Sequence, residues 1–88
     1  MFRIWGRTFK DNHLINDHVA VLPNEDTRTH KVFAGIEEIC HEFNIMQPIW
    51  LDKNIREFKR FSLTRFNSDS FTEQNDFDYL EIRILEED

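Results

Sequence analysis

The chain has 88 residues, which is enough for one domain and too few for two of ordinary size. With 40% hydrophobic and 32% charged residues, its composition excludes a disordered segment and a protein built of membrane-spanning helices. The net charge of −6 argues against a general nucleic-acid binder, and the single cysteine, Cys40, excludes an intramolecular disulfide framework. We therefore expect one cytoplasmic domain over residues 1–88.

The N-terminal segment predicts a β-hairpin. Residues 2–9 are rich in aromatic and branched side chains and are typical of a strand. Lys10-Asp11-Asn12 fits a tight turn, because Asp and Asn tolerate left-handed backbone conformations. Residues 13–22 then predict a returning strand that ends at Pro23. Gly6 within the first strand indicates either a bulge or a close approach by another element.

The clearest helix follows, with Asp26 or Thr27 as its N-cap. Asn44 fits the left-handed position that ends a helix, and Ile45 is placed to contact Cys40 as the accompanying apolar pair. Apolar residues between these ends recur at helical period and form one stripe: Val32, Phe33, Ile36, Ile39, Cys40 and Phe43.

A second, shorter helix is predicted after residues 46–51, which Pro48 keeps extended. Asp52 is a suitable N-cap. Basic and aromatic residues alternate along this helix but separate in space at about 100° per residue. Nucleic-acid bases stack where rings lie beside cations, so we expect a core-facing apolar stripe and a solvated basic face. The first comprises Ile55, Phe58 and Phe61, and the second Lys53, Arg56 and Arg60.

Residues 62–76 are polar and predict a long loop, with a short strand around Phe71 as an alternative. Residues 77–85 predict a strand with Leu80, Ile82 and Ile84 on one face and Tyr79, Glu81 and Arg83 on the other. Glu81 and Arg83 could pair with charges on the N-terminal hairpin. Residues 69–88 carry eight acids against one arginine, and we expect this segment to lie beside basic residues.

Together these elements predict an α+β fold. We expect a small, mainly antiparallel sheet, formed by the N-terminal hairpin plus the C-terminal strand, with two helices packed on one face. Trp5 and Phe9 lie opposite Phe2 and Ile4 on the first strand. Helices on one face only would therefore leave one of these pairs exposed.

Several strings of the chain resemble a family of small cytoplasmic proteins of clostridia-like anaerobic Gram-positive bacteria, whose function is unknown. The resemblance covers nearly the whole chain, and it implies a bacterial origin and a complete chain. It implies no activity, cofactor or catalytic residue. The strings are DTRTHKVF (26–33), CHEFNI (40–45), PIWLDKNIREFKR (48–60), TRFNSDSF (64–71) and DFDYLEIRILEED (76–88).

No pattern in the sequence indicates a catalytic, cofactor-binding or metal site. His13 and His18 should face opposite sides of one strand, and His30 and His41 lie about 16 Å apart along the first helix. Cys40 belongs to the apolar stripe, where a thiol packs as a small hydrophobe. No CxxC, HExxH, calcium loop or glycine-rich phosphate loop is present. We expect no cofactor and no enzyme, and an enzyme is the least favoured of three interpretations.

The favoured interpretation is a small non-catalytic protein-interaction or regulatory module, whose partner is another protein or a second copy of the chain. The alternative is a nucleic-acid-associated protein that uses the basic segment 53–65. Neither interpretation involves a membrane. The candidate interaction surface combines hydrogen-bond donors with aromatic rings: Trp5, Phe9, Lys53, Arg56, Arg60, Thr64, Arg65, Phe66 and Asn67.

Overall fold

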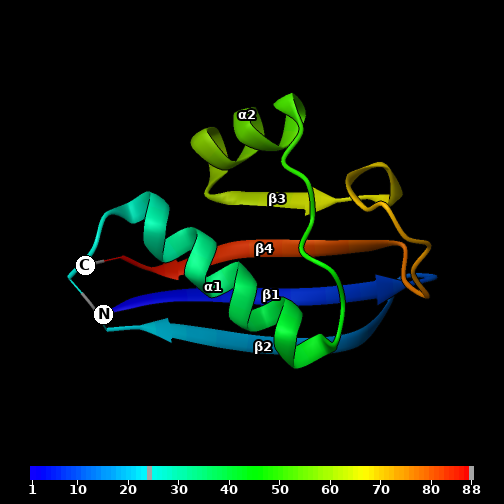
Figure 1. The fold of residues 1–88 in the computed structure, drawn as a ribbon, viewed down its shortest axis with the longest axis horizontal. Coiled ribbons are helices and arrows are strands. Elements are labelled where there is room, and N and C mark those ends of the chain that lie inside the picture. The colour runs from blue at the N-terminus through cyan, green and yellow to red at the C-terminus, as the bar shows by residue number, and fades with distance from the viewer. Residues whose placement is uncertain (24, 88) are drawn as a thin grey trace.

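The computed structural model describes residues 1–23 and 25–87, and it confirms the predicted α+β class. A four-stranded antiparallel sheet in the order β2-β1-β4-β3 carries both helices on one face (Figure 1). The elements are β1 (Phe2–Lys10), β2 (His13–Leu22), α1 (Arg28–Phe43), α2 (Asp52–Phe61), β3 (Leu63–Phe66), the short 3-10 helix η1 (Ser68–Ser70) and β4 (Tyr79–Glu86).

The predicted hairpin of β1 and β2 is confirmed. Asp11 and Asn12 adopt left-handed backbone angles, with φ of 51° and 65°, which is the conformation of a two-residue hairpin turn. Gly6 marks a close approach, because a Cβ atom there would lie 2.4 Å from Cγ2 of Ile39 on α1. The register shift of the hairpin lies between Thr8 and Phe9 instead.

The ends of α1 follow the sequence signals. Thr27 is the N-cap, and its side chain accepts a hydrogen bond from the backbone N–H of His30. Asn44 ends the helix with φ of 56°, and the N–H of the next residue, Ile45, donates to the carbonyl of Cys40 at 2.9 Å. One stripe residue departs from the prediction, since Phe33 is half exposed at the edge of the buried face.

The orientation predicted for α2 is right for Phe58, which is buried, and for Arg56 and Arg60, which are exposed, but it is wrong for Ile55 and Phe61. Leu51, rather than Asp52, is the N-cap, and the buried face consists of Asn54 and Phe58. Ile55 and Phe61 are 40% and 64% exposed. The physical reason is the amide of Asn54, which bonds to β3 beneath the helix and turns the neighbouring apolar residues outward.

The predicted loop over residues 62–76 contains β3, which begins directly after a left-handed turn at Ser62, with φ of 54°. The strand alternative around Phe71 is wrong. Phe71 is instead a buried core residue that meets Phe77 edge-on, with ring centroids 5.5 Å apart. β4 has the predicted facing, because Leu80 and Ile82 are fully buried under the helices.

The core lies between the helices and the sheet. Trp50, in the extended segment between α1 and α2, meets Phe58 and Phe66 edge-on at centroid distances of 5.4 Å and 4.9 Å. This aromatic group joins α2 and β3 to the rest of the core. The other buried apolar residues are Phe2, Ile4, Ala20, Val32, Ile36, Ile39, Cys40, Phe71, Leu80 and Ile82.

Candidate interaction surfaces

The position of α2 depends on one buried amide. Asn54 is fully buried, and its Nδ2 donates to Thr64 Oγ1 at 2.9 Å and to the carbonyl of Arg65 at 3.0 Å. Its Oδ1 accepts from the N–H of Leu51 at 3.1 Å and from Ser70 Oγ at 3.5 Å. Because donors and acceptor are all satisfied, the amide fixes the helix to β3, its entry segment and η1.

Two residues of the predicted interaction surface are not on any surface. Thr64 and Phe66 are both 0% exposed, so the prediction is wrong for them. They alternate with Arg65 along β3, and their side of the strand lies beneath α2. Assigning residues 62–76 to a loop hid this alternation, which buries every second side chain of a strand.

The remaining seven predicted residues lie on two sides of the molecule. Trp5, Phe9 and Arg65 belong to the face of the sheet opposite the helices. Lys53, Arg56 and Arg60 are on α2, and Asn67 is exposed after β3. Lys53 is already paired, with its Nζ 3.0 Å from Asp69 Oδ2. The structure therefore does not bring the predicted residues together into one site.

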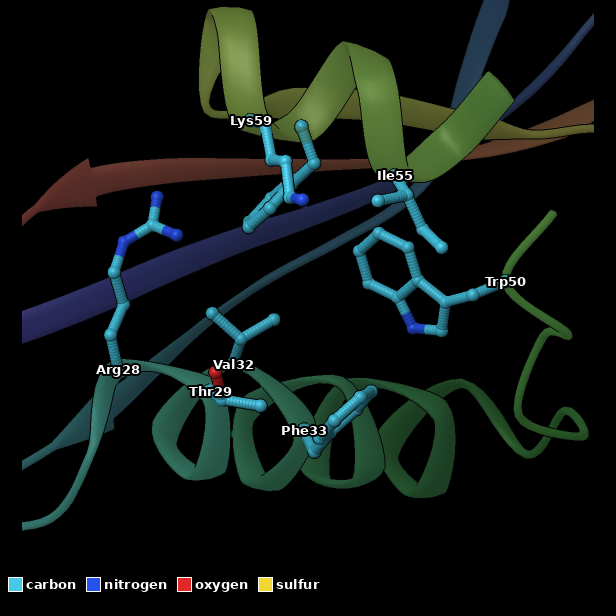
Figure 2. Close-up of a pocket in the computed structure, with 8 residues that line it drawn as sticks. Arg28, Thr29, Val32, Phe33, Trp50, Ile55 and Lys59 are labelled. Atoms are coloured by element: carbon cyan, nitrogen blue, oxygen red, sulfur yellow. The ribbon is translucent and has the colours of Figure 1, made fainter. Parts of the chain in front are cut away.

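A groove that the sequence did not reveal lies between the two helices, and we call it the α1–α2 groove. Its volume is about 240 Å³. Figure 2 shows Val32 and Phe33 on the α1 side and Ile55 and Lys59 on the α2 side. Trp50 projects into it from the connecting segment. Its apolar lining comprises Val32, Phe33, Trp50, Ile55 and Phe58.

Cations border this apolar groove. Arg28 lines it from the start of α1, with its guanidinium 5.4 Å from the ring centroid of Phe58 and its Nε 2.9 Å from Glu87 Oε1. Lys59 lines it from α2, and Arg56 and Arg60 are exposed on the same helix. Within residues 1–23 and 25–87, these three α2 cations have no carboxylate partner.

The second surface is the side of the sheet that no helix of the described chain covers, and we call it the open sheet face. At its centre, Glu81 is almost inaccessible, because Arg7 Nη2 lies 2.6 Å from Oε1 and Arg65 Nε lies 3.3 Å from Oε2. This confirms that Glu81 pairs with the hairpin. The face comprises Arg3, Trp5, Arg7 and Phe9 of β1, Asp17, Val19 and Val21 of β2, Leu63 and Arg65 of β3, and Tyr79, Glu81 and Arg83 of β4.

Guanidinium groups and rings are neighbours on this face. The guanidinium of Arg7 lies 4.0 Å from the ring centroid of Trp5 and 5.1 Å from that of Phe9. That of Arg65 lies 4.8 Å from the ring of Tyr79, which in turn stacks on Phe9 at 5.2 Å. These are cation–π distances. Tyr79 and Arg7 were not among the predicted site residues, because only the strand register shows that they are neighbours.

Protein-family models, curated proteins and solved structures give no match to the chain. In the described part of the chain, no helix is long and apolar enough to cross a membrane. The same residues contain no group of three or more His, Cys, Asp or Glu side chains that could hold a metal ion. The α1–α2 groove and the open sheet face are therefore the two candidate functional sites.

Cys40 gives a first testable prediction. Its side chain is buried in α1, and burial raises the pKa of the thiol to about 12. Because only the thiolate reacts, native protein at about pH 8 should alkylate roughly a thousandfold more slowly than urea-unfolded protein, whose thiol has a pKa near 8.5. Mass spectrometry of iodoacetamide-treated samples measures both rates. Equal rates would contradict a buried Cys40.

Proposed function

We propose that the protein is a non-catalytic interaction module that binds an acidic, amphipathic helix of a partner protein in the α1–α2 groove. The observation that carries the proposal is an open apolar groove lined by Lys59, on a helix whose cations Arg56, Lys59 and Arg60 have no carboxylate partner in the described chain. In a chain with 17 acidic and 11 basic residues, cations are the scarcer charge and would be expected to find partners.

The size of the groove supports a peptide rather than a small molecule. Its volume of about 240 Å³ is below the range of roughly 300–1,000 Å³ typical of small-molecule pockets. A helix that lies in such a groove inserts apolar anchors from one face, at positions i, i+3, i+4 and i+7. A few anchor side chains are enough to occupy it.

The walls of the groove offer apolar surface that folding leaves uncovered. Phe33 is 50% exposed on the α1 side and Ile55 is 40% exposed on the α2 side. Complete burial of such a side chain contributes about 1.5–3 kcal/mol, so covering their exposed parts would stabilise a complex. A partner anchor between Phe33 and Ile55 would cover both.

The cations define the chemistry of the partner. Lys59 lines the groove itself, and Arg56 and Arg60 extend the positive surface along α2. Carboxylates flanking the apolar anchors of a partner helix would meet them. Charge pairs at the rim of an interface act mainly on specificity and on the association rate, so the complex should weaken as salt concentration rises.

The alternative of a nucleic-acid site on the basic segment 53–65 has less support. Lys53 and Arg65, at the two ends of that segment, are already paired with Asp69 and Glu81. Of the other three cations of the segment, Lys59 lines an apolar groove, which has no use in binding a phosphate backbone.

A designed peptide tests the proposal. A fluorescein-labelled helix of about 16 residues, with Leu at i, i+3, i+4 and i+7 and Glu at the flanking positions, should raise its anisotropy on titration with the protein. Ile55→Asp should abolish binding, and Lys59→Glu should weaken it about tenfold. Lys10→Glu, at the far hairpin turn, is the matched control and should change nothing.

The outcomes decide between occupants. No binding of the acidic peptide at millimolar concentration would overturn the proposal, as would equal binding to the Ile55→Asp variant. Equal binding of a peptide with Lys in place of Glu would overturn the charge argument. Sedimentation of the protein alone, over the same concentrations, would reveal a second copy of the chain as the occupant instead.

A further inference from the structure

The open sheet face carries guanidinium groups beside aromatic rings. Those of Arg7 and Arg65 lie 4.0 Å and 4.8 Å from the ring centroids of Trp5 and Tyr79. Rings beside cations are what bases of nucleic acid stack upon. We propose that the open sheet face binds single-stranded nucleic acid by base stacking.

The rings are placed on the two central strands of the sheet. Trp5 and Phe9 belong to β1 and Tyr79 to its neighbour β4, and all three are partly exposed. Both helices pack on the other side (Figure 1). A four-stranded sheet with aromatic residues on one uncovered face is a known solution for single strands, in which two or three unstacked bases lie on the rings.

Arginine supplies the remaining contacts. The face carries four arginines and no lysine, and a guanidinium plane stacks on a base as an aromatic ring does. Glu81 holds Arg7 and Arg65 in place over the rings, so these planes are ordered before a ligand arrives. Arg83, opposite Trp5 across the strands, has no carboxylate partner among the described residues and is available to a phosphate.

The charge of the face predicts how binding should respond to salt. The four arginines of the face are accompanied by three carboxylates, those of Asp17, Glu81 and Glu86, the last of which is the partner of Arg3. The face is therefore near neutral, although the net charge of the chain is −6. Stacking must then contribute more than phosphate contacts. Because Arg3 is paired with Glu86, Arg83 is the phosphate contact, and the slope of log K against log salt should be about −0.7.

The same geometry excludes a duplex as the preferred ligand. The bases of a duplex are stacked on one another and do not present their faces to a flat sheet, whereas those of a single strand do. Sequence preference should be slight, since every base has a π-face. This site lies on the side of the sheet away from the α1–α2 groove, so it does not depend on the proposed function.

The test uses the full chain and labelled oligo-dT and oligo-U of about 12 nucleotides, titrated by anisotropy between roughly 50 and 300 mM salt. Trp5→Leu should weaken binding about five- to hundredfold, as expected for loss of one stacked base. Because Trp5 also contacts Arg7 and Asp17, Arg83→Gln is the second variant, with an expected loss of about fivefold. Arg60→Gln, on α2, is the matched control.

Loss of binding in both sheet variants with wild-type affinity in Arg60→Gln supports the proposal. Absence of binding at about 100 μM protein and the lowest salt overturns it. If Arg60→Gln weakens oligonucleotide binding and Arg83→Gln has no effect, the proposal is also overturned, and the binding site lies on α2. Equal affinity for a duplex of the same length would mean that a general charge effect, and not base stacking, causes the binding. Peptide binding in the α1–α2 groove is measured separately, so either result stands without the other.

Discussion

Asn54→Ala should lower the free energy of unfolding by about 3 kcal/mol, the largest effect expected of any single substitution considered for this protein. The change removes both donors to β3 and the acceptor of the Leu51 N–H and the Ser70 hydroxyl, and it leaves a small cavity. Each buried polar group left without a partner costs about 1–3 kcal/mol. For a small domain this is a large part of the total stability.

Urea unfolding followed by far-ultraviolet circular dichroism measures the effect. Asn67→Ala is the matched control, because Asn67 is exposed and its side chain makes no capping hydrogen bond to η1. It should stay within about 0.5 kcal/mol of the wild type. Similar losses in the two variants would mean that the amide of Asn54 does not hold α2 on β3.

Gly6→Ala should destabilise the protein by about 2 kcal/mol through overpacking. The new Cβ would lie 2.4 Å from Cγ2 and 2.9 Å from Cδ1 of Ile39, which is fully buried in α1. The backbone of Gly6 is in the ordinary strand region, without positive φ, so the effect is steric and not conformational. Relief requires α1 to move away from β1.

Gly35→Ala is the control for Gly6→Ala. Its Cβ would meet mainly Cδ1 of Ile4, the far end of a flexible side chain, at 2.7 Å. Alanine also favours a helix over glycine by about 0.8–1.0 kcal/mol, which offsets the contact, so the net change should be below about 1 kcal/mol. In an Ile39→Ala background, Gly6→Ala should become nearly neutral in urea titrations. Persistence of the full loss there would contradict the steric explanation.

The elements with local signals could be predicted from the sequence. The hairpin has Asp11 and Asn12 at its turn, and α1 has Thr27 and Asn44 at its ends. These residues act on their immediate neighbours, through left-handed angles or capping hydrogen bonds, and need no knowledge of the rest of the fold. In β4 the apolar residues Leu80 and Ile82 likewise alternate with the charged residues Glu81 and Arg83, which predicts the two faces of the strand.

The orientation of α2 could not be predicted in this way. Helical periodicity treats Asn54 as a surface residue and Ile55 as a core residue, and the structure has the reverse. The burial of Asn54 is favourable only because Thr64 and the Arg65 carbonyl accept its hydrogen bonds. Those partners are ten and eleven residues away, on a strand of four residues, too short for a distinct alternation pattern.

The two candidate surfaces likewise depend on residues that are distant in the sequence. The exposed pair Trp5 and Phe9 was foreseeable from alternation along one strand. Tyr79 joins them only through the pairing of β1 with β4, in which Phe9 lies opposite Tyr79. The α1–α2 groove also depends on tertiary placement, since it forms where Phe33 and Ile55 face one another across a gap that neither helix defines alone.

The strand order has a consequence for how the chain acquires its structure. β4 comes last of the four strands in chain order but lies between β1, which comes first, and β3, so the sheet cannot form its centre until β4 has been synthesised. Until residue 86 emerges, β1 and β3 have no bridge, and Phe66 has no Leu80 beside it. The pairing of β1 with β4 joins strands far apart in the sequence, which should make folding slow relative to helical domains of this size. During that interval the unpaired edges of β1 and β3 would be open to a chaperone or to another nascent chain.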